Sequence, residues 1–117
     1  MENSITSEKT LFVKTGNSIR RVLSSDISYL RCEKNVTHLF LRDGEDLPCL
    51  RLLRLFEEDL AGCGFVRINH NIIVNLGEIR EIVMEGRKRV VVLTGGTALG
   101  ISARKWRTVK AVLLGQQ

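Results

Sequence analysis

The sequence predicts a mostly β protein with two small helices packed on its outside. Short runs of strand-forming residues recur along the chain, turns containing Gly or Asn separate them, and two segments have the spacing of an amphipathic helix. The chain has 117 residues, 44% of them apolar, and one proline. We therefore expect a single folded domain over residues 1–117, with its core at about 10–114.

The first third of the chain is expected to form β-hairpins. Residues 10–14 and 18–23 are strand-like runs around a Thr-Gly-Asn turn, where glycine supplies the positive φ that a tight hairpin needs. After a serine-rich turn, residues 27–32 and 36–41 are the next strands. The polar loop 33–35 separates them, as expected for a second hairpin.

The middle of the chain is expected to hold an edge strand and the first helix. Residues 45–49 follow an Asp-Gly turn, and their proline, which has no N–H to donate, predicts a strand at a sheet edge. Residues 50–60 carry Leu52, Phe56 and Leu60 at four-residue intervals. This is the stripe of a helix that covers a sheet, and two glycines shortly afterwards predict its end.

The second half is expected to return to strands. The run 66–74 is apolar except at 69–71, which predicts two short strands joined by an exposed bend. Further strands are predicted at 79–85, 88–93 and 98–101, because turn-forming glycines separate them.

The last helix is predicted at 103–114. Ser102 is a suitable N-cap, and Trp106, Val109 and Leu113 share one face of the helix. Because of that shared face, we expect Trp106 to pack in the core and not to serve as a platform for stacking bases.

The charge of the chain is unevenly distributed. Its net charge is +5, yet residues 1–64 hold nine Lys and Arg against ten Asp and Glu, whereas residues 65–117 hold nine against three. A positive second half favours a polyanionic partner, of which nucleic acid is the commonest. A basic, solvated surface without a partner is the alternative.

Several protein classes find no support in the sequence. No apolar run approaches the ~18 residues of a membrane span, and the polar start lacks the features of a signal peptide, so we expect a cytoplasmic protein without membrane contact. Cys32, Cys49 and Cys63 form no C-x-x-C pair, and the two histidines have no metal-ligand spacing, so we expect free thiols and no metal or other cofactor. Without a nucleophile elbow or a phosphate-cradling glycine loop, we expect no enzyme.

The most informative segment is 65–75, with the sequence FVRINHNIIVN. Arg67 can neutralise a phosphate, and the apolar run at its end can anchor the segment in a core. His70 and the amides of Asn69 and Asn71 can donate to and accept from base edges. This chemistry suits the reading of DNA, although His70 taken alone is equally well explained as a surface imidazole without a partner.

This segment resembles the central motif of the LytTR DNA-binding domain, the output module of many bacterial two-component response regulators. Two further landmarks follow in the same order as in that family: Asp26-Ile27-Ser28-Tyr29-Leu30 resembles an early strand, and Ile101-Ser102-Ala103-Arg104 resembles the closing pattern before a terminal helix. The resemblance covers residues 11–114. It implies an elongated fold of short antiparallel β-sheets with small helices, which binds DNA through loops placed in successive major grooves.

The resemblance implies three places of DNA contact. The second and third also follow from the residues themselves. The side chains at 69–71 suit base edges, while the N-terminus of the last helix leaves N–H groups for a phosphate and the Arg104 fork matches a guanine edge. The implied contact residues are Lys34, Asn35 and Thr37 in the first loop, Arg67, Asn69, His70 and Asn71 in the central motif, and Ser102, Arg104, Lys105 and Arg107 at the start of the last helix.

The central motif departs from the family pattern. Asn69-His70-Asn71 stands where His-Arg-Ser is usual, and Val36 and Ile72 stand where aromatic residues are common. One positive charge is lost and an amide is gained. We therefore expect binding to be retained and the preferred base sequence to shift.

A second basic segment carries Arg80, Arg87, Lys88 and Arg89 around a predicted hairpin. These side chains could follow a phosphate backbone. However, Arg-rich hairpin tips are usually solvated, and this interpretation is favoured from the sequence.

The predicted function is that of a sequence-specific regulator of transcription that binds double-stranded promoter DNA. We expect repeated half-sites about one helical turn apart, occupied by two copies as a homodimer on DNA. The chain is either a free-standing regulator controlled by a separate partner or part of a larger one with an upstream receiver domain. The alternative is a protein-interaction module that keeps the fold without DNA binding.

RNA is disfavoured as a ligand. Readers of single-stranded RNA expose aromatic side chains for stacking, and aromatic residues make up 5% of this chain. We expect its four phenylalanines, Phe12, Phe40, Phe56 and Phe65, to be buried.

Overall fold

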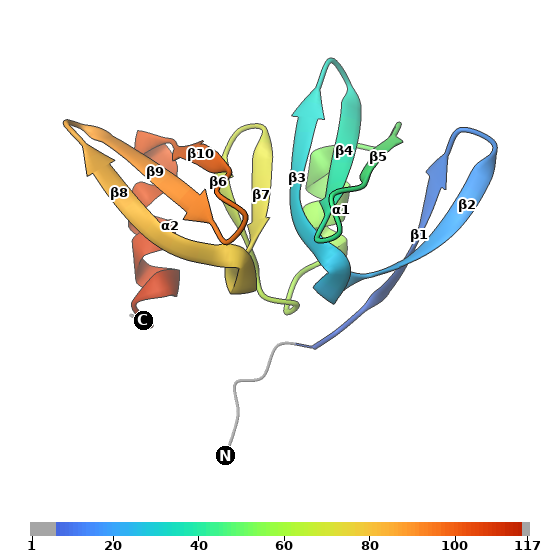
Figure 1. Cartoon of the computed structure of the whole chain (residues 1–117), viewed down its shortest axis with the longest axis horizontal. Helices are drawn as coiled ribbons and strands as arrows, with labels where there is room; N and C mark the ends of the chain where they lie inside the picture. The colour runs from blue at the N-terminus through green and yellow to red at the C-terminus, as the bar shows by residue number, and fades with distance from the viewer. Residues whose placement is uncertain (1–6, 116–117) are drawn as a thin grey trace.

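The computed structural model describes residues 7–115, which form three antiparallel β-sheets side by side (Figure 1). The molecule measures 44 × 38 × 24 Å, and the sheets follow one another along its longest axis. The mostly β prediction is therefore confirmed. In the view of Figure 1, β1 begins and α2 ends at the lower side of the molecule, while most hairpin turns point to the upper side.

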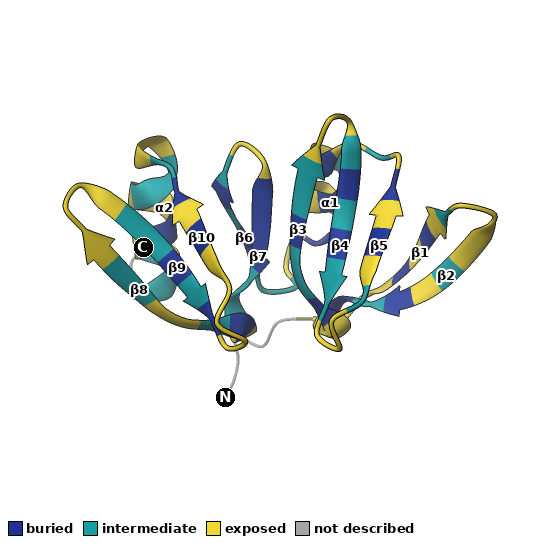
Figure 2. Cartoon of the chain, turned by 45° about the horizontal axis from the view of Figure 1, so that its top comes forward, coloured by how far each residue is buried: buried dark blue, intermediate teal, exposed yellow. Residues whose placement is uncertain are grey.

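The first sheet is the hairpin of β1 (Thr10–Thr15) and β2 (Ser18–Leu23). Alternation along β1 turns Leu11 and Val13 into the core and leaves Phe12 71% exposed. The prediction that Phe12 is buried is therefore wrong, because its two neighbours take the inward face. Figure 2 shows this alternation along the hairpin.

The central sheet has five strands in the order β5-β4-β3-β7-β6. A 3-10 turn, η1 (Ser24–Asp26), precedes it, and β5 lies at one edge, as its proline predicted. The strands are β3 (Ile27–Glu33), β4 (Val36–Leu41), β5 (Asp46–Cys49), β6 (Phe65–Asn69) and β7 (Ile72–Asn75).

The first helix is shorter than predicted. It covers Leu53–Asp59 as α1, and Leu52 precedes it with extended backbone angles and a 54% exposed side chain. The buried residues are Leu53, Phe56 and Leu60, at intervals of three and four. The placement of Leu52 in the apolar stripe was therefore wrong, because the chain is still extended there as it leaves β5.

The third sheet, in the order β10-β9-β8, carries the last helix. Its elements are η2 (Leu76–Glu78), β8 (Ile79–Glu85), β9 (Lys88–Leu93), β10 (Ala98–Ile101) and α2 (Ala103–Leu113). The hydroxyl of Ser102 accepts from the N–H of Lys105, so the predicted N-cap is confirmed. Val109 is fully buried, and Trp106 and Leu113 pack against the same core, as predicted.

The β6–β7 hairpin forms the wall between two hydrophobic cores. Ile73 belongs to the first core, with β1 to β5 and α1, whereas Ile72 and Val74 belong to the second, with β8 to β10 and α2. Because strand side chains alternate between faces, a strand buried on both sides needs an uninterrupted apolar run. The sequence Ile72-Ile73-Val74 meets that need.

Two polar contacts join the parts of the molecule on either side of this hairpin. The side-chain amide of Asn75 donates to the carbonyl of Ile27 at 2.9 Å, and its oxygen accepts from the N–H of Gly77 at 2.9 Å. The guanidinium of Arg42, after β4, lies 3.0 Å from the carboxylate of Glu78, before β8. Asn75 thus satisfies backbone groups of a turn, as Asn side chains commonly do.

Candidate nucleic-acid interface

One edge of the molecule carries a row of turns, which we call the loop rim. It consists of the turns at 34–35, 69–71 and 86–87 and the start of α2 at 102–104, and in Figure 1 it runs along the upper side. Strand register explains why these segments meet. Arg31, near the end of β3, pairs with Ile72, at the start of β7, so the β3–β4 turn and the β6–β7 bend lie at the same end of the central sheet.

The β6–β7 bend is fixed by the side chain of Asn69. Its oxygen accepts from the N–H of Asn71 at 2.7 Å, and its nitrogen donates to the carbonyl of Gly100, on β10, at 2.8 Å. Asn69 therefore shapes the bend and ties it to the third sheet. The side chains of His70 and Asn71 are left exposed at the tip.

Arg67 supports the same bend from below. Its Nε donates to the carbonyl of Asn69 at 3.0 Å and its Nη2 to the carbonyl of His70 at 2.6 Å, while Nη1 contacts the carboxylate of Glu57, on α1, at 2.7 Å. The side chain is 15% exposed. Each guanidinium nitrogen thus already has an acceptor, so this geometry fits a residue that positions the loop better than the predicted phosphate contact.

The start of α2 lies beside the bend. The N–H of Ser102 donates to the carbonyl of Ile68 at 2.9 Å, which joins the end of β10 to the end of β6. Arg104 and Arg107 are exposed, and Lys105 is half-buried. The first turn of a helix also presents N–H groups that have no partner within the helix, and these suit an anion.

The β3–β4 turn is a tight two-residue turn. Lys34 and Asn35 have φ of 48° and 69°, in the left-handed region, and both are exposed. Thr37 is instead 0% exposed, and its hydroxyl donates to the carbonyl of Arg51 at 2.6 Å. The prediction that Thr37 contacts DNA is therefore wrong, because this strand position faces inward.

A shallow groove of about 420 Å³ joins the bend at 69–71 to Ser102 and to the end of β3, directly before the β3–β4 turn. The N–H of Cys32 donates to the carbonyl of Asn71 at 2.9 Å, which holds β3 against the bend. Sequence reasoning missed Arg31, a groove residue whose guanidinium lies 5.8 Å from the ring centroid of Tyr29. Its signal was its position in the strand directly before the predicted loop. The groove is lined by Arg31, Cys32, Glu33, Asn69, His70, Asn71, Ile72 and Ser102.

The basic residues of the second half are mostly uncompensated. Within residues 65–115, Arg67 and Arg80 have a carboxylate within 4 Å. The seven others have none among the described residues, so their positive field is directed to solvent. They are Arg87, Lys88, Arg89, Arg104, Lys105, Arg107 and Lys110.

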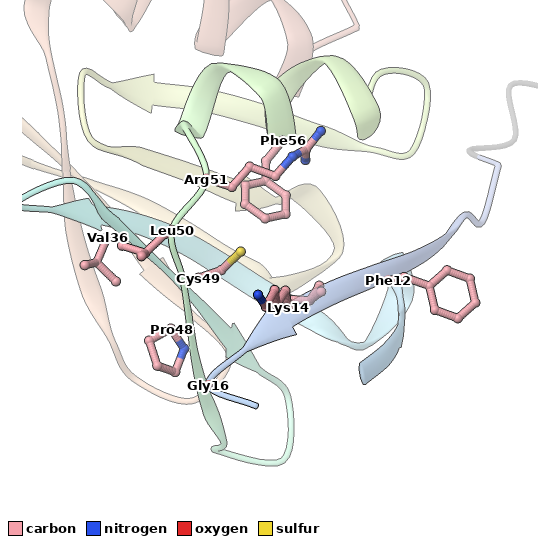
Figure 3. Close-up of a pocket in the computed structure, with 10 residues that line it drawn as sticks. Phe12, Lys14, Gly16, Val36, Pro48, Cys49, Leu50, Arg51 and Phe56 are labelled. Carbon is pink, nitrogen blue, oxygen red and sulfur yellow. The ribbon is translucent and has the colours of Figure 1, made fainter. Parts of the chain in front are cut away.

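A second, apolar groove (Figure 3) is formed by β1 and β5, which lie at the other end of the molecule from α2 in Figure 1. It has a volume of about 640 Å³ between β1, β5 and the segment that leads into α1. Burial raises the pKa of the Cys49 thiol there, and Leu50 is 85% exposed. The groove is lined by Phe12, Val13, Lys14, Gly16, Val36, Pro48, Cys49, Leu50, Arg51 and Phe56.

The described part of the chain shows neither a metal cluster nor a membrane helix. Within residues 7–115, no three His, Cys, Asp or Glu side chains lie together as metal ligands would. No helix there has the length and apolar character needed to cross a membrane. Cys32, Cys49 and Cys63 are free thiols.

These features define a β domain that presents a basic row of turns. The chain matches the family model of the LytTr DNA-binding domain over residues 17–114, so it belongs to the LytTR family, as its three landmarks predicted. Its structure is similar to a solved one described as the LytTr DNA-binding domain of a methyl-accepting/DNA response regulator from Bacillus cereus. The TM-score is 0.75 at 21% identity, with 91% of this chain and 96% of the other covered. A search of curated proteins found no match.

Proposed function

We propose that this protein regulates transcription by binding double-stranded DNA sequence-specifically, with the loop rim inserted in the major groove. One observation carries the proposal. Two segments far apart in the chain, 69–71 and 102–104, are joined by hydrogen bonds to Ile68 and Gly100, and each carries exposed polar residues, His70 and Asn71 in the first and Arg104 in the second. Membership of a DNA-binding family supports the same conclusion.

The residues of the rim divide into readers and supports. We assign the reading of base edges to His70, Asn71 and Arg104, whose exposed groups match the donors and acceptors of the major groove. Lys34 and Asn35 would contact the backbone or a neighbouring base from the β3–β4 turn.

The supports hold these readers in place. Asn69 and Arg67 fix the bend, and Ser102 caps α2. Lys105 and Arg107 add positive charge close to the cap, which strengthens binding to phosphates without specifying bases.

The target is promoter DNA with repeated half-sites, each bound by one copy. Loops from one rim would enter the major groove on a single side of the duplex, so two copies would need sites about one helical turn apart, ~34–36 Å. Such a regulator acts in the cytoplasm, under the control of an upstream receiver domain or of a separate partner.

Selection from random duplex DNA, followed by binding measurements on Arg104→Ala, tests this function. The wild-type protein should enrich one sequence class, and the variant should lose ~1–3 kcal/mol of binding free energy and relax the preference at one position. Lys110→Ala, which removes a cation from the last turn of α2, is the control and should keep the preference. Unchanged affinity and preference in Arg104→Ala would show that its role is misassigned.

The alternative is a protein-interaction module without DNA binding. The apolar groove, with exposed Phe12 and Leu50, is the feature that would favour it. Under that alternative, no duplex would be enriched even at low salt, where phosphate contacts are strongest.

A further inference from the structure

We infer that the tip of the β8–β9 hairpin, formed by Arg87, Lys88 and Arg89, binds the phosphate backbone of the same duplex, on the flank next to Arg104. The inference rests on the proposed function and extends it to a contact outside the readers and supports. The sequence favoured a solvated surface for this hairpin. Three features of the structure favour contact with DNA over a solvated surface.

The first feature is unpaired charge. Arg87 and Lys88 are exposed, and no carboxylate lies within 4 Å of either among residues 7–115. Glu85 faces Lys88 in the strand register and is the one acid of the tip, against three cations. Lower on the same hairpin, Arg80 is paired with Glu81 at 3.3 Å, so it is not part of the proposed surface.

The second feature is rigid attachment to α2. The Arg89 guanidinium lies 4.8 Å over the ring of Trp106, and its Nη1 donates to the carbonyl of Arg87 at 3.4 Å. Its Nε is buried without a hydrogen-bond partner among the described residues. A guanidinium stacked on an aromatic ring is held in one orientation, so binding costs little side-chain entropy.

The third feature is position. Arg89 pairs with Ile101, directly before Ser102, which sets the hairpin tip beside the start of α2. In Figure 1 the tip stands at one end of the loop rim, and Figure 2 shows it exposed. On a duplex that lies along the rim, the tip would therefore meet the backbone that flanks the bases read by Arg104.

Without a partner, the charges of this tip keep an unfavourable mutual repulsion. Three cations at one tip repel one another, and α2, on which Arg89 is stacked, carries four further cations without a carboxylate partner among the described residues. A duplex relieves this repulsion, because its phosphates replace the missing carboxylates and release counterions. Contacts of this kind raise affinity and leave base preference unchanged.

The test compares the salt dependence of binding for the double variant Arg87→Gln/Lys88→Gln and the wild type. The probe is the selected duplex with at least ~10 base pairs added on each side, one helical turn. Loss of two phosphate contacts should make the slope of log K against log salt shallower by about 1.8. The affinity ratio of wild type to variant should therefore change roughly tenfold between 50 and 200 mM salt, while base preference stays the same.

A matched control removes two cations elsewhere. Lys9→Gln/Lys110→Gln has the same net charge as the test variant, but its changes precede β1 and fall in the last turn of α2, away from the loop rim. It should keep nearly the wild-type slope. Arg87→Lys/Lys88→Arg, which retains both charges, should do the same, and this excludes a purely structural effect of the tip.

A shortened duplex locates the contact. When the flank next to Arg104 is removed, wild type and test variant should bind equally, because the hairpin then has no phosphates to meet. A wild-type slope in the test variant on the long duplex, or a difference that persists on the short one, would overturn the inference alone. If the wild-type protein enriches no duplex, the proposed function fails instead.

Discussion

The two halves of the chain hold the same number of basic residues and use them differently. Residues 1–64 and 65–117 each have nine Lys and Arg, but the first half has ten acids and the second has three. In the first half, Arg20, Arg42, Arg51 and Arg54 are paired with carboxylates. The second half is therefore basic because it has few acids, while its number of cations is the same. Counting Lys and Arg alone would not reveal this difference.

The molecule has two separate hydrophobic cores, which share the β6–β7 hairpin. Phe56 is the largest fully buried side chain of the first core, Ile68 is fully buried in the second, and β6–β7 contributes to both cores. A shared wall predicts that neither core is stable without the other. The DNA-binding bend would then be held by the whole molecule.

The largest effects should come from truncating either core. Phe56→Ala should lower the free energy of unfolding by ~3–5 kcal/mol, and Ile68→Ala by ~2–5 kcal/mol, because each leaves a cavity at a fully buried position. Calorimetry should show one cooperative transition in both variants. Two separate transitions in either variant would show that one core can remain folded without the other.

An intermediate effect should come from the ion pair between the halves. Glu78 is nearly buried and accepts from Arg42 and from the hydroxyl of Thr94 at 3.1 Å. Arg42→Leu removes one of these donors and should cost ~1–3 kcal/mol in a denaturant titration. In the double variant with Glu78→Gln the cost should be less than the sum of the two single costs. Strict additivity would mean that the pair does not couple the halves.

The smallest effect should come from an exposed pair within the first half. The hydrogen bond and charge of Arg20 lower the pKa of Glu45 below its ordinary 4.5, so the contribution of this pair is present above that value and is lost as the pH falls through the lowered pKa. Arg20→Gln should therefore flatten the stability profile below about pH 4.5 and lower stability slightly near neutrality. The stability of wild type and variant is measured by urea titration at a series of pH values. If stability falls equally steeply in both at acid pH, this ion pair does not contribute to stability.

The fold was predictable where local signals set it. Turns fixed the hairpins, and Ser102 fixed the start of α2, because their chemistry acts over a few residues. The start of α1 was misplaced because Leu52 continues an extended segment whose course depends on β5. The exposure of Phe12 depends on which face of β1 meets the core, and alternation alone does not decide that.

The candidate site was predictable in place and less so in role. Three segments singled out by motif lie on one rim, yet Thr37 turned out to be buried. Arg67 is engaged by carbonyls of its own bend and by Glu57, a partner from a distant helix that no local pattern indicates. No carboxylate of residues 7–115 lies within 4 Å of Arg87 or Lys88, although Glu85 faces Lys88, and this too is a property of the three-dimensional arrangement.

The lower side of the molecule, where β1 begins and α2 ends, offers a practical advantage. A fluorescent protein, affinity tag or surface linker attached on this side would lie away from the rim and leave the duplex unobstructed. Immobilised protein should consequently bind as protein free in solution does, which makes surface-based kinetics a fair way to measure this molecule.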